Sequence, residues 1–416
     1  MKLLTLTHIY RWPTYLKLVF SFAALFSLLL FIVSASQLKL PAPEIQQCPL
    51  LECVCPTCSI GDFPDSSVPV PTHNSESSPL CPSADVYDSL DISTNEPIDI
   101  LISWVDDSDP VWAAKRNAEY RKLGMKPLDN DRRWKEHSEL KYCIRSIEKF
   151  YPNFRYLYLL TDNQIPSFIS LNHPKLKIIS HHDIVPKELH NSVLPTFNSV
   201  AFEVFLWNIP NISTNFLYLN DDFFFGNSVD ISYFLDSNRI VQYHHNDVWK
   251  PANTEYSKAI FYTIKQLKNK LNTDPKKGYQ RLAHFPRLIN KKLFKHIFDL
   301  FYNEMINAAN SKFRYKKSEF DTMSAYLFGI NSLSNLNCKS LVSMRLQYTP
   351  YIAIANDLQK TKNHLKMIKY IKPPFYNIND NLRKGDPHII QEVLHNLAEF
   401  FENMYPTPSS FEKFSQ

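Results

Sequence analysis

Two spacings of apolar residues alternate along the region that begins at residue 97. Short runs rich in Ile, Leu and Tyr are typical of buried strands, whereas apolar residues that recur every three to four positions mark one face of a helix. By these patterns we expect strands at Ile98–Val105, Arg155–Thr161, Leu176–Ser180 and Phe216–Leu219, and helices at Ser138–Tyr151 and Ser199–Asn208. Strands that alternate with helices predict an α/β fold with a doubly wound, mostly parallel sheet.

Helical additions come after this alternating core. The turn His284-Phe285-Pro286 introduces a predicted helix at Arg287–Phe301, and another helix is predicted behind the Asp-Pro pair that starts at Asp386. The apolar residues of this C-terminal helix share one face: Ile390, Val393, Leu394, Leu397 and Phe401. We therefore expect the helix to dock on the domain through that face.

An uncharged, mostly apolar run at Leu18–Leu38 has about the 20 residues that a bilayer-spanning helix needs. Lys2, Arg11 and Lys17 precede it, so the positive-inside rule predicts a type II orientation. We expect the rest of the chain in the lumen of the Golgi or another secretory-pathway compartment. The alternative is a signal peptide that ends at Ala35, although the apolar run exceeds the roughly 7–15 residues typical of one.

Residues 39–96 differ in composition from the rest of the chain, with prolines spread among Ser, Asp and Glu and little apolar periodicity. This composition predicts a stalk and not a domain. Most of the chain's 7 cysteines fall here, at Cys48, Cys53, Cys55, Cys58 and Cys81. In a translocated segment disulfides are the default, and an odd number suggests a disulfide-linked homodimer. A zinc site at Cys55 and Cys58 is the alternative, but no matching second pair accompanies them.

The predicted layout has five parts: a cytoplasmic tail at 1–17, a transmembrane signal anchor at 18–38, the stalk at 39–96, a catalytic domain at 97–385 and a C-terminal amphipathic helix and tail at 386–416. The formal net charge of +5 is far below that of a dedicated nucleic-acid-binding protein, so no nucleic-acid partner is expected. Basic residues, among them Arg281, Arg287 and Arg314, crowd three segments, at 276–295, 312–317 and 360–372. Such runs are usually solvated helix faces, and a few of these basic residues are candidates for anion binding.

Glycine spacing limits how the chain can bind phosphate. The 6 glycines are too far apart to form G-x-G-x-x-G or G-x-x-x-x-G-K-[ST], which excludes the Rossmann and P-loop phosphate cradles. Acidic residues do come after two predicted strands, at Asp106–Asp109 and Asp221–Asp222. Since ligands bind beyond the carboxyl ends of strands in such sheets, these clusters suit Mg²⁺ or Mn²⁺. The alternative for both clusters is a turn with solvated acids.

The same residues belong to four stretches that occur in a recognisable order. The first is Ser103-Trp104-Val105-Asp106-Asp107-Ser108-Asp109-Pro110; the second includes Glu139-Leu140-Lys141-Tyr142, Arg145-Ser146-Ile147-Glu148, Thr161-Asp162-Asn163-Gln164, Thr196-Phe197-Asn198-Ser199 and Leu219-Asn220-Asp221-Asp222; the third is His284-Phe285-Pro286 with Arg314; the fourth is Asn377-Ile378-Asn379-Asp380. Together they resemble the Stealth family of sugar-phosphate transferases. That family includes bacterial capsule polymerases and the alpha/beta subunit of the lysosomal-enzyme N-acetylglucosamine-1-phosphotransferase.

The resemblance implies an activity and a set of site residues. The activity is transfer of a sugar 1-phosphate, typically N-acetylglucosamine 1-phosphate, from a UDP-sugar to a hydroxyl of a glycan or glycoprotein acceptor, with release of UMP. The implied catalytic residues are Asp222, His284 and Arg314, the implied metal ligands are Asp221, Asp222 and Asp380, and the implied substrate-binding residues are Trp104, Asp106, Arg145, Gln164 and Asn198.

The chemistry of these residue types fits that activity. A metal and an arginine neutralise charge on a transferring phosphoryl group, and a histidine with its ordinary pKa of about 6.5 can accept the acceptor's proton. His284 has a simpler interpretation as a residue that flanks a helix. Two alternatives remain for the whole chain: a metal-dependent glycosyltransferase that releases UDP, and a catalytically inactive, membrane-tethered homologue.

Overall fold

The computed structural model describes residues 98–127, 134–236, 239–271, 280–314, 341–345 and 351–413. The predicted anchor at Leu18–Leu38 and the stalk cysteines lie outside these ranges. Of the helices inside them, none combines the length and the apolar character that crossing a bilayer requires.

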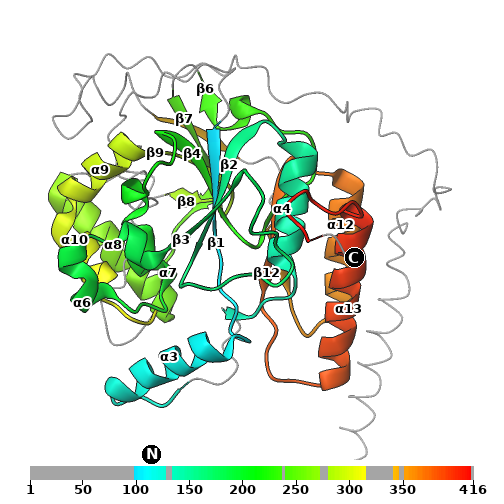
Figure 1. The fold of residues 1–416 in the computed structure, drawn as a ribbon, viewed down its shortest axis with the longest axis horizontal. Helices are drawn as coiled ribbons and strands as arrows, with labels where there is room; N and C mark the ends of the chain where they lie inside the picture. The colour runs from blue at the N-terminus through cyan, green and yellow to red at the C-terminus, as the bar shows by residue number, and fades with distance from the viewer. Residues whose placement is uncertain are drawn as a thin grey trace, which may run out of the picture. The chain divides into compact units, whose positions relative to one another are not determined.

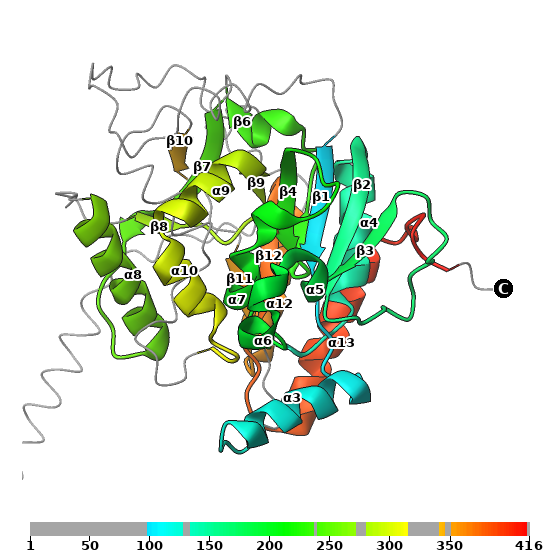
Figure 2. The same ribbon diagram turned by 60° about the vertical axis from the view of Figure 1, so that its left-hand side comes forward.

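The main sheet lies at the centre of the fold (Figures 1 and 2). Its strands run in the order β3 (Leu176–Ser180), β2 (Phe154–Thr161), β1 (Ile98–Ser103), β4 (Asn215–Asn220) and β9 (Arg287–Asn290). Neighbours among the first four strands are parallel, and only β9 runs antiparallel to its neighbour, β4. The prediction of an α/β fold with a mostly parallel sheet is therefore confirmed.

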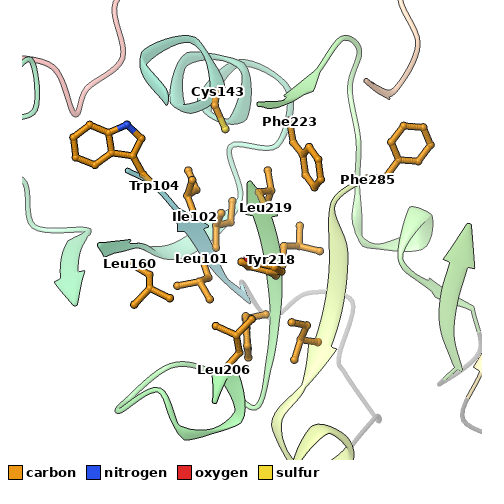
Figure 3. Packing of buried hydrophobic residues seen from close by; sticks show 14 of the residues in the cluster. Leu101, Ile102, Trp104, Cys143, Leu160, Leu206, Tyr218, Leu219, Phe223 and Phe285 are labelled. Carbon is orange, nitrogen blue, oxygen red and sulfur yellow. The ribbon is translucent and has the colours of Figure 1, made fainter. Parts of the chain in front are cut away.

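Helices cover both faces of this sheet, as Figure 1 shows. One side carries α4 (Glu139–Phe150), α12 (Leu358–Ile371) and α13 (Pro387–Met404), and the other side carries α6 to α10. In Figure 3 Cys143 of α4 points toward the main sheet, on the side opposite Leu206. Cys143 is fully buried, so the prediction that it serves as a small apolar residue is confirmed.

The remaining helices include two longer ones, α3 and α8, and several of 10 residues or fewer. They are α3 (Pro110–Lys122), α5 (His181–Ile184), α6 (His190–Val193), α7 (Ser199–Glu203), α8 (Glu255–Leu271), α9 (Lys291–Leu300) and α10 (Tyr302–Ala309), with 3-10 turns at Lys187–Leu189, Leu206–Asn208 and Ile231–Tyr233. Helix α3 begins where the Asp109 carboxylate accepts from the backbone N–H groups of Val111 and Trp112, at 2.8 and 3.3 Å, and Pro110 occupies its first turn.

Two smaller sheets flank the main one. The first contains β10 (Leu341–Arg345), β7 (Arg239–Val248) and β6 (Leu235–Asp236), with β8 (Gln280–Leu282) also paired to β7. The second contains β11 (Tyr351–Ile354), β12 (Phe375–Asp380) and β5 (Phe223–Phe225), in that order. Because β5 begins directly after the turn at the end of β4, the second small sheet brings the end of β12 to the main sheet.

Three predicted boundaries were wrong. The predicted helix at Arg287–Phe301 is a strand, β9, and then α9, because Arg287–Asn290 pairs with β4 and is buried throughout. The predicted helix at Ser199–Asn208 divides into α7 and a 3-10 turn, within a stretch whose residues 200–206 are all buried. The strand predicted to end at Val105 ends at Ser103. In each case tertiary packing outweighs local periodicity.

The C-terminal helix was predicted correctly. Helix α13 begins behind Asp386, whose carboxylate accepts from the backbone N–H of His388 at 2.9 Å. Its buried residues Val393, Leu397 and Phe401 lie on the face that the apolar spacing predicted. The ring of Phe401 stacks on Tyr142 of α4, with ring centroids 4.8 Å apart.

Candidate active site

The ends of the two central strands place the two acidic segments side by side. Ser103 at the end of β1 lies opposite Asn220 at the end of β4. Strand order changes direction between these two strands, since β2 and β3 extend to one side of β1 and β4 lies on the other. Such a switch point is where open α/β sheets bind ligands. Trp104 and Asp221, the residues that follow these two strands, thus lie at the carboxyl edge of the sheet, where a ligand site was predicted.

Asp222 joins this edge to β12. Its carbonyl oxygen accepts from the backbone N–H of Ile378 at 3.1 Å, and its Oδ2 accepts from Nδ2 of Asn377 at 2.7 Å. Its Oδ1 is buried and has no hydrogen-bond partner among the described residues. Burial raises the pKa of the Asp222 carboxyl to about 7. Within the described part of the chain, Asp222 is therefore a partly buried residue whose Oδ1 is buried and unused as an acceptor.

Two further carboxyl groups interact electrostatically with this turn: Glu139 is the first residue of α4, and Glu136 precedes the helix. Oε2 of Glu136 accepts from Nε1 of Trp104 at 2.6 Å. Burial raises the pKa of Glu136 to about 7, despite the Trp104 bond, and the charge of Asp106 adds to the effect. Burial and the charges of Glu136 and Asp221 raise the pKa of Glu139, and burial with the charges of Glu136 and Asp222 raises that of Asp221. These carboxyl groups form one mutually repelling cluster.

Asp380, at the end of β12, contacts the same segment. Its Oδ2 lies 3.2 Å from Nε2 of His137, and its Oδ1 accepts from the backbone N–H of Leu382 at 2.7 Å. The chain turns sharply between His137 and α4, since Ser138 adopts a left-handed φ of 70°. Asp222 precedes β5 and Asp380 ends β12, and these two strands pair. That both residues serve one site stays a prediction.

Sequence reasoning missed Glu136 and His137, and it assigned no role to Glu139. The signal was weak, because acidic residues at the start of a helix are common for dipole reasons alone. The close spacing of Glu136, His137 and Glu139 shortly after Trp134 is the pattern that would have pointed to them.

The predicted metal ligands do not form a closely spaced group in the metal-free structure. Within the described ranges, no three His, Cys, Asp or Glu side chains are arranged as a metal-binding group. The donors nevertheless fit a hard divalent cation: Asp221, Asp222 and Asp380 supply carboxylate oxygens, and Asp222 keeps one buried oxygen unused. A cation would also offset the repulsion that raises these pKa values.

His284 lies on the other side of Phe223, the residue after Asp222. The two rings meet edge to face with centroids 4.7 Å apart, and Phe223 and the neighbouring Phe285 are both visible in Figure 3. Burial, with smaller contributions from the charges of Arg287 and Arg314, lowers the pKa of His284 to about 3. The expectation of an ordinary pKa for this histidine was therefore wrong for the free protein. Arg287, one of the basic residues that the sequence placed around this segment, is thus a charged neighbour of His284.

Arg314 is positioned by a small aromatic cluster beside α3. Phe313 stacks on Tyr120, with centroids 3.8 Å apart, and on Phe197, with centroids 5.2 Å apart. Nη2 of Arg314 donates to the hydroxyl of Ser199. The positive charge of Arg314 contributes to the lowered pKa of His284. The structure thus places two of the three predicted catalytic residues, His284 and Arg314, close enough for their charges to interact. The third, Asp222, precedes Phe223, whose ring contacts His284.

The predicted substrate-binding residues divide into two groups. At the site edge, the Gln164 amide holds the loop after β1: it accepts from the backbone N–H of Asp106 at 3.1 Å and donates to the Asp106 carbonyl at 2.7 Å and to Asp109 at 3.2 Å. Trp104 is 8% exposed and is held by Glu136. Trp104, Asp106 and Gln164 therefore shape the rim of the site.

Asn198 and Arg145 are engaged elsewhere. Asn198 caps α7 through a bond from the backbone N–H of Val200, at 3.2 Å, and is 1% exposed. Arg145 donates to Glu412 at 2.6 and 2.8 Å and to the Tyr405 carbonyl at 2.9 Å, so the C-terminal segment occupies its guanidinium group. Substrate binding by these two residues stays a prediction.

The fold and the site together define an α/β protein in which carboxylates line one edge of the sheet and a partly buried histidine lies near two arginines. A family model, Stealth protein CR2, conserved region 2, matches residues 133–243. Among curated proteins, the chain is similar to the capsular polysaccharide phosphotransferase fcs1 of Haemophilus influenzae, with 28% identity over 324 residues, 76% of this chain and 85% of the relative.

Other relatives carry the same description. The capsular polysaccharide phosphotransferase WcwK of Streptococcus pneumoniae is 27% identical over 76% of this chain and 98% of the relative. That of Actinobacillus suis is 38% identical over 34% of this chain and 39% of the relative. Among solved structures, the galactosyltransferase LgtC with donor and acceptor sugar analogs aligns with 75% of this chain and 98% of its own, at a TM-score of 0.36 and 10% identity. The matches confirm that this chain resembles the Stealth family of sugar-phosphate transferases.

Proposed function

We propose that this protein transfers a sugar 1-phosphate, with N-acetylglucosamine as the sugar, from a UDP-sugar to a hydroxyl group of a glycan or glycoprotein acceptor. One observation carries the proposal: Phe223 lies between a cluster of partly buried carboxyl groups and a partly buried histidine whose pKa is lowered further by the charges of two arginines. A diphosphate needs both a cation and fixed positive charge around it. Relatives named as phosphotransferases support the same class of reaction.

A Mg²⁺ or Mn²⁺ ion is part of the proposal, with Asp222 and Asp380 as its principal ligands and Asp221 beside them. Such an ion supplies charge neutralisation at the diphosphate. The residues fit because their carboxylates are hard oxygen donors and Asp222 has an unused buried oxygen.

His284 and Arg314 take the remaining roles. The acceptor oxygen forms a bond to the phosphorus next to the sugar, the bond from that phosphorus to the bridging oxygen breaks, and the bridging oxygen leaves with UMP. The acceptor's proton passes to His284, whose lowered pKa keeps it neutral in the free protein. A bound diphosphate offsets the charges of Arg287 and Arg314, which makes His284 a stronger base when the donor is present.

The released nucleotide tests the proposal. The full chain is incubated with UDP-sugars and simple glycosides, with and without Mn²⁺, and the nucleotide products are separated. We expect UMP and a product that contains a phosphodiester. UDP as the sole nucleotide product would establish the glycosyltransferase alternative, and absence of turnover with every donor would establish the inactive homologue.

Variants test the residues. Arg314→Ala is expected to lower turnover by about 10²–10³-fold, the usual cost of losing one preorganised donor to a transition state. Asp222→Asn is expected to abolish turnover while the circular dichroism spectrum stays that of the wild type. Asp299→Asn is the matched control, since Asp299 is 55% exposed in an i,i+4 pair with Lys295. Unfolding of Asp222→Asn would mean that Asp222 is structural.

We also propose that the chain is a type II protein of a Golgi or related membrane, with residues 97–416 in the lumen and a disulfide-linked homodimer formed through the stalk cysteines. Support comes from the apolar run at Leu18–Leu38 and the cations before it. In sealed vesicles residues 97–416 should resist added protease, and non-reducing electrophoresis should show twice the monomer mass.

A further inference from the structure

Three residues form a row across the small sheet of β11, β12 and β5. Strand β11 begins at Tyr351, which pairs with Asn377 of β12, and Asn377 in turn pairs with Phe223 at the start of β5. Residues that lie directly opposite each other on neighbouring strands project their side chains to the same face of a sheet. The side chains of Tyr351, Asn377 and Phe223 therefore share one face, in that order.

His284 lies over this row. Its ring meets the ring of Phe223 with centroids 4.7 Å apart and the ring of Tyr351 with centroids 6.4 Å apart, both edge to face. Since neighbouring strands are roughly 4.8 Å apart, Phe223 and Tyr351 are separated by two strand spacings, about 10 Å. One imidazole contacts both rings only from a position between them. His284 thus has an aromatic neighbour on each side.

Solvent exposure rises along the row. Phe223 is 1% exposed and Asn377 is fully buried, where it donates to the Asp222 carboxylate at 2.7 Å. Tyr351 is 44% exposed, and β11 is the outer strand of this sheet among the described residues. The row therefore leads from the carboxylate side of the site, beneath His284, to an aromatic ring that is open to solvent.

We propose that Tyr351 forms the acceptor subsite, in which its ring packs against the sugar that carries the attacking hydroxyl group. The placement rests on the proposed function, in which His284 takes the proton of that hydroxyl. To lose its proton, the hydroxyl must come within about 3 Å of a ring nitrogen of His284. The attached sugar then lies against a neighbour of His284, and of the two aromatic neighbours Tyr351 is the exposed one.

The geometry of phosphoryl transfer agrees with this placement. The attacking and leaving oxygens lie roughly in line, on opposite sides of the phosphorus. The proposed cation at Asp221 and Asp222 neutralises the departing phosphate, so UMP belongs at the carboxylate end of the row. The acceptor must then approach from the other end, where Tyr351 lies.

An aromatic ring in this position selects the class of acceptor. A pyranose with several axial C–H groups on one side has an apolar face that packs on the electron-rich face of a tyrosine ring, while the hydroxyl groups at its rim stay available to His284. An open-chain polyol such as glycerol has the hydroxyl groups without that face. We therefore expect a ring-form glycoside as the acceptor, in preference to small alcohols.

Tyrosine nitration of the full chain tests the subsite without any turnover. The chain is treated with tetranitromethane in methyl glycosides of glucose, galactose, mannose and N-acetylglucosamine, or in glycerol, each with and without UMP and Mn²⁺. Peptide mass spectrometry locates the nitrated residues. Nitration of Tyr351 should slow about tenfold when at least one glycoside reaches ten times its Kd, and glycerol should not protect it. Tyr302 of α10, which is 49% exposed, is the matched control and should react equally throughout.

Variants separate the tyrosine ring from its hydroxyl group. Tyr351→Thr removes the ring and keeps a residue that suits a strand, so the circular dichroism spectrum should stay that of the wild type. Its KM for the protecting glycoside should rise about tenfold, the factor for losing one aromatic contact, while kcat and the KM for the UDP-sugar change little. Tyr351→Phe keeps the ring and should keep the acceptor KM of the wild type.

Absence of protection by every glycoside, or an unchanged acceptor KM in Tyr351→Thr, would overturn the proposal. Protection by UDP-N-acetylglucosamine alone would overturn it too, since the donor sugar would then occupy Tyr351. Failure of the proposed function has a different signature: UDP as the nucleotide product, or no turnover at all, while a glycoside still protects Tyr351 from nitration.

Discussion

Burial sets the protonation of the site residues, and it acts in opposite directions on the two sides of Phe223. A buried carboxyl group resists ionisation, so the pKa of Asp222 rises to about 7, while a buried imidazole resists protonation, so the pKa of His284 falls to about 3. At mildly acidic pH both groups are therefore neutral. A donor that brings negative charge and a cation that brings positive charge would each restore the ionised forms.

The His284 shift predicts a pH-dependent stability difference. Unfolded His284 binds a proton below about pH 6.5, whereas the folded form resists it down to about 3, so the folded state loses stability as pH falls through this window. His284→Gln removes that loss. Relative to the wild type, the variant should gain about 3 kcal/mol in unfolding free energy between pH 7 and pH 4, measured by urea denaturation with EDTA. A pH-independent difference would show that His284 is not held neutral.

At the scale of elements, the C-terminal segment after α13 is fastened to α4. Arg145 is 6% exposed and donates to Glu412 at 2.6 and 2.8 Å, and it also meets Glu402 at 3.5 Å. These contacts join positions that are far apart along the chain. The segment behind α13 is thus part of the fold.

Glu412→Ala should destabilise the protein by about 3 kcal/mol, because it leaves the buried Arg145 charge without its principal partner. Glu402→Ala is the matched control: that carboxylate is 53% exposed and should cost less than about 1 kcal/mol. Chemical denaturation measures both. Equal effects would mean that the fastening does not depend on the buried pair.

A second prediction at this scale concerns the start of α3. Asp109→Ala removes the acceptor of the Val111 and Trp112 backbone N–H groups and should cost about 1 kcal/mol. Asp109→Asn keeps an acceptor and should recover most of that loss. If both variants are equally stable, the Gln164 bond and not the cap holds this loop.

At the scale of the whole molecule, the site exists only where several segments meet: the ends of β1 and β4, the end of β12, the start of α4, and the segments that carry His284 and Arg314. The carboxyl groups of the cluster raise one another's pKa values, which makes cation binding favourable to the folded state.

Mn²⁺ at about 100 times its Kd should therefore stabilise the protein by about 2.7 kcal/mol and raise Tm by roughly 2–4 °C in thermal denaturation. Asp222→Asn should lose most of this increase, while Asp299→Asn should keep it. An unchanged Tm in the wild type would contradict a divalent cation at this site, independently of any measurement of turnover.

Local pattern was sufficient for much of the fold. Apolar periodicity predicted the strand Leu176–Ser180 at its observed bounds and α4 and α13 to within a few residues, because these elements bury the faces that their own spacing defines. The acidic residues after β1 and β4 were also found this way, since a parallel sheet must place the carboxyl ends of its strands at one edge.

Tertiary structure alone decided the rest. Arg287–Asn290 reads as the start of a helix but becomes a strand, since β4 offers a partner for its backbone hydrogen bonds. His137 reaches Asp380 across 243 positions, and nothing in either local segment specifies that contact. The protonation of Asp222 and His284 likewise depends on the atoms packed around them from distant segments. Sequence determined which residues could serve at this edge, and packing determined which of them meet and in which charge state, because burial and electrostatic interaction depend on distance in space and not along the chain.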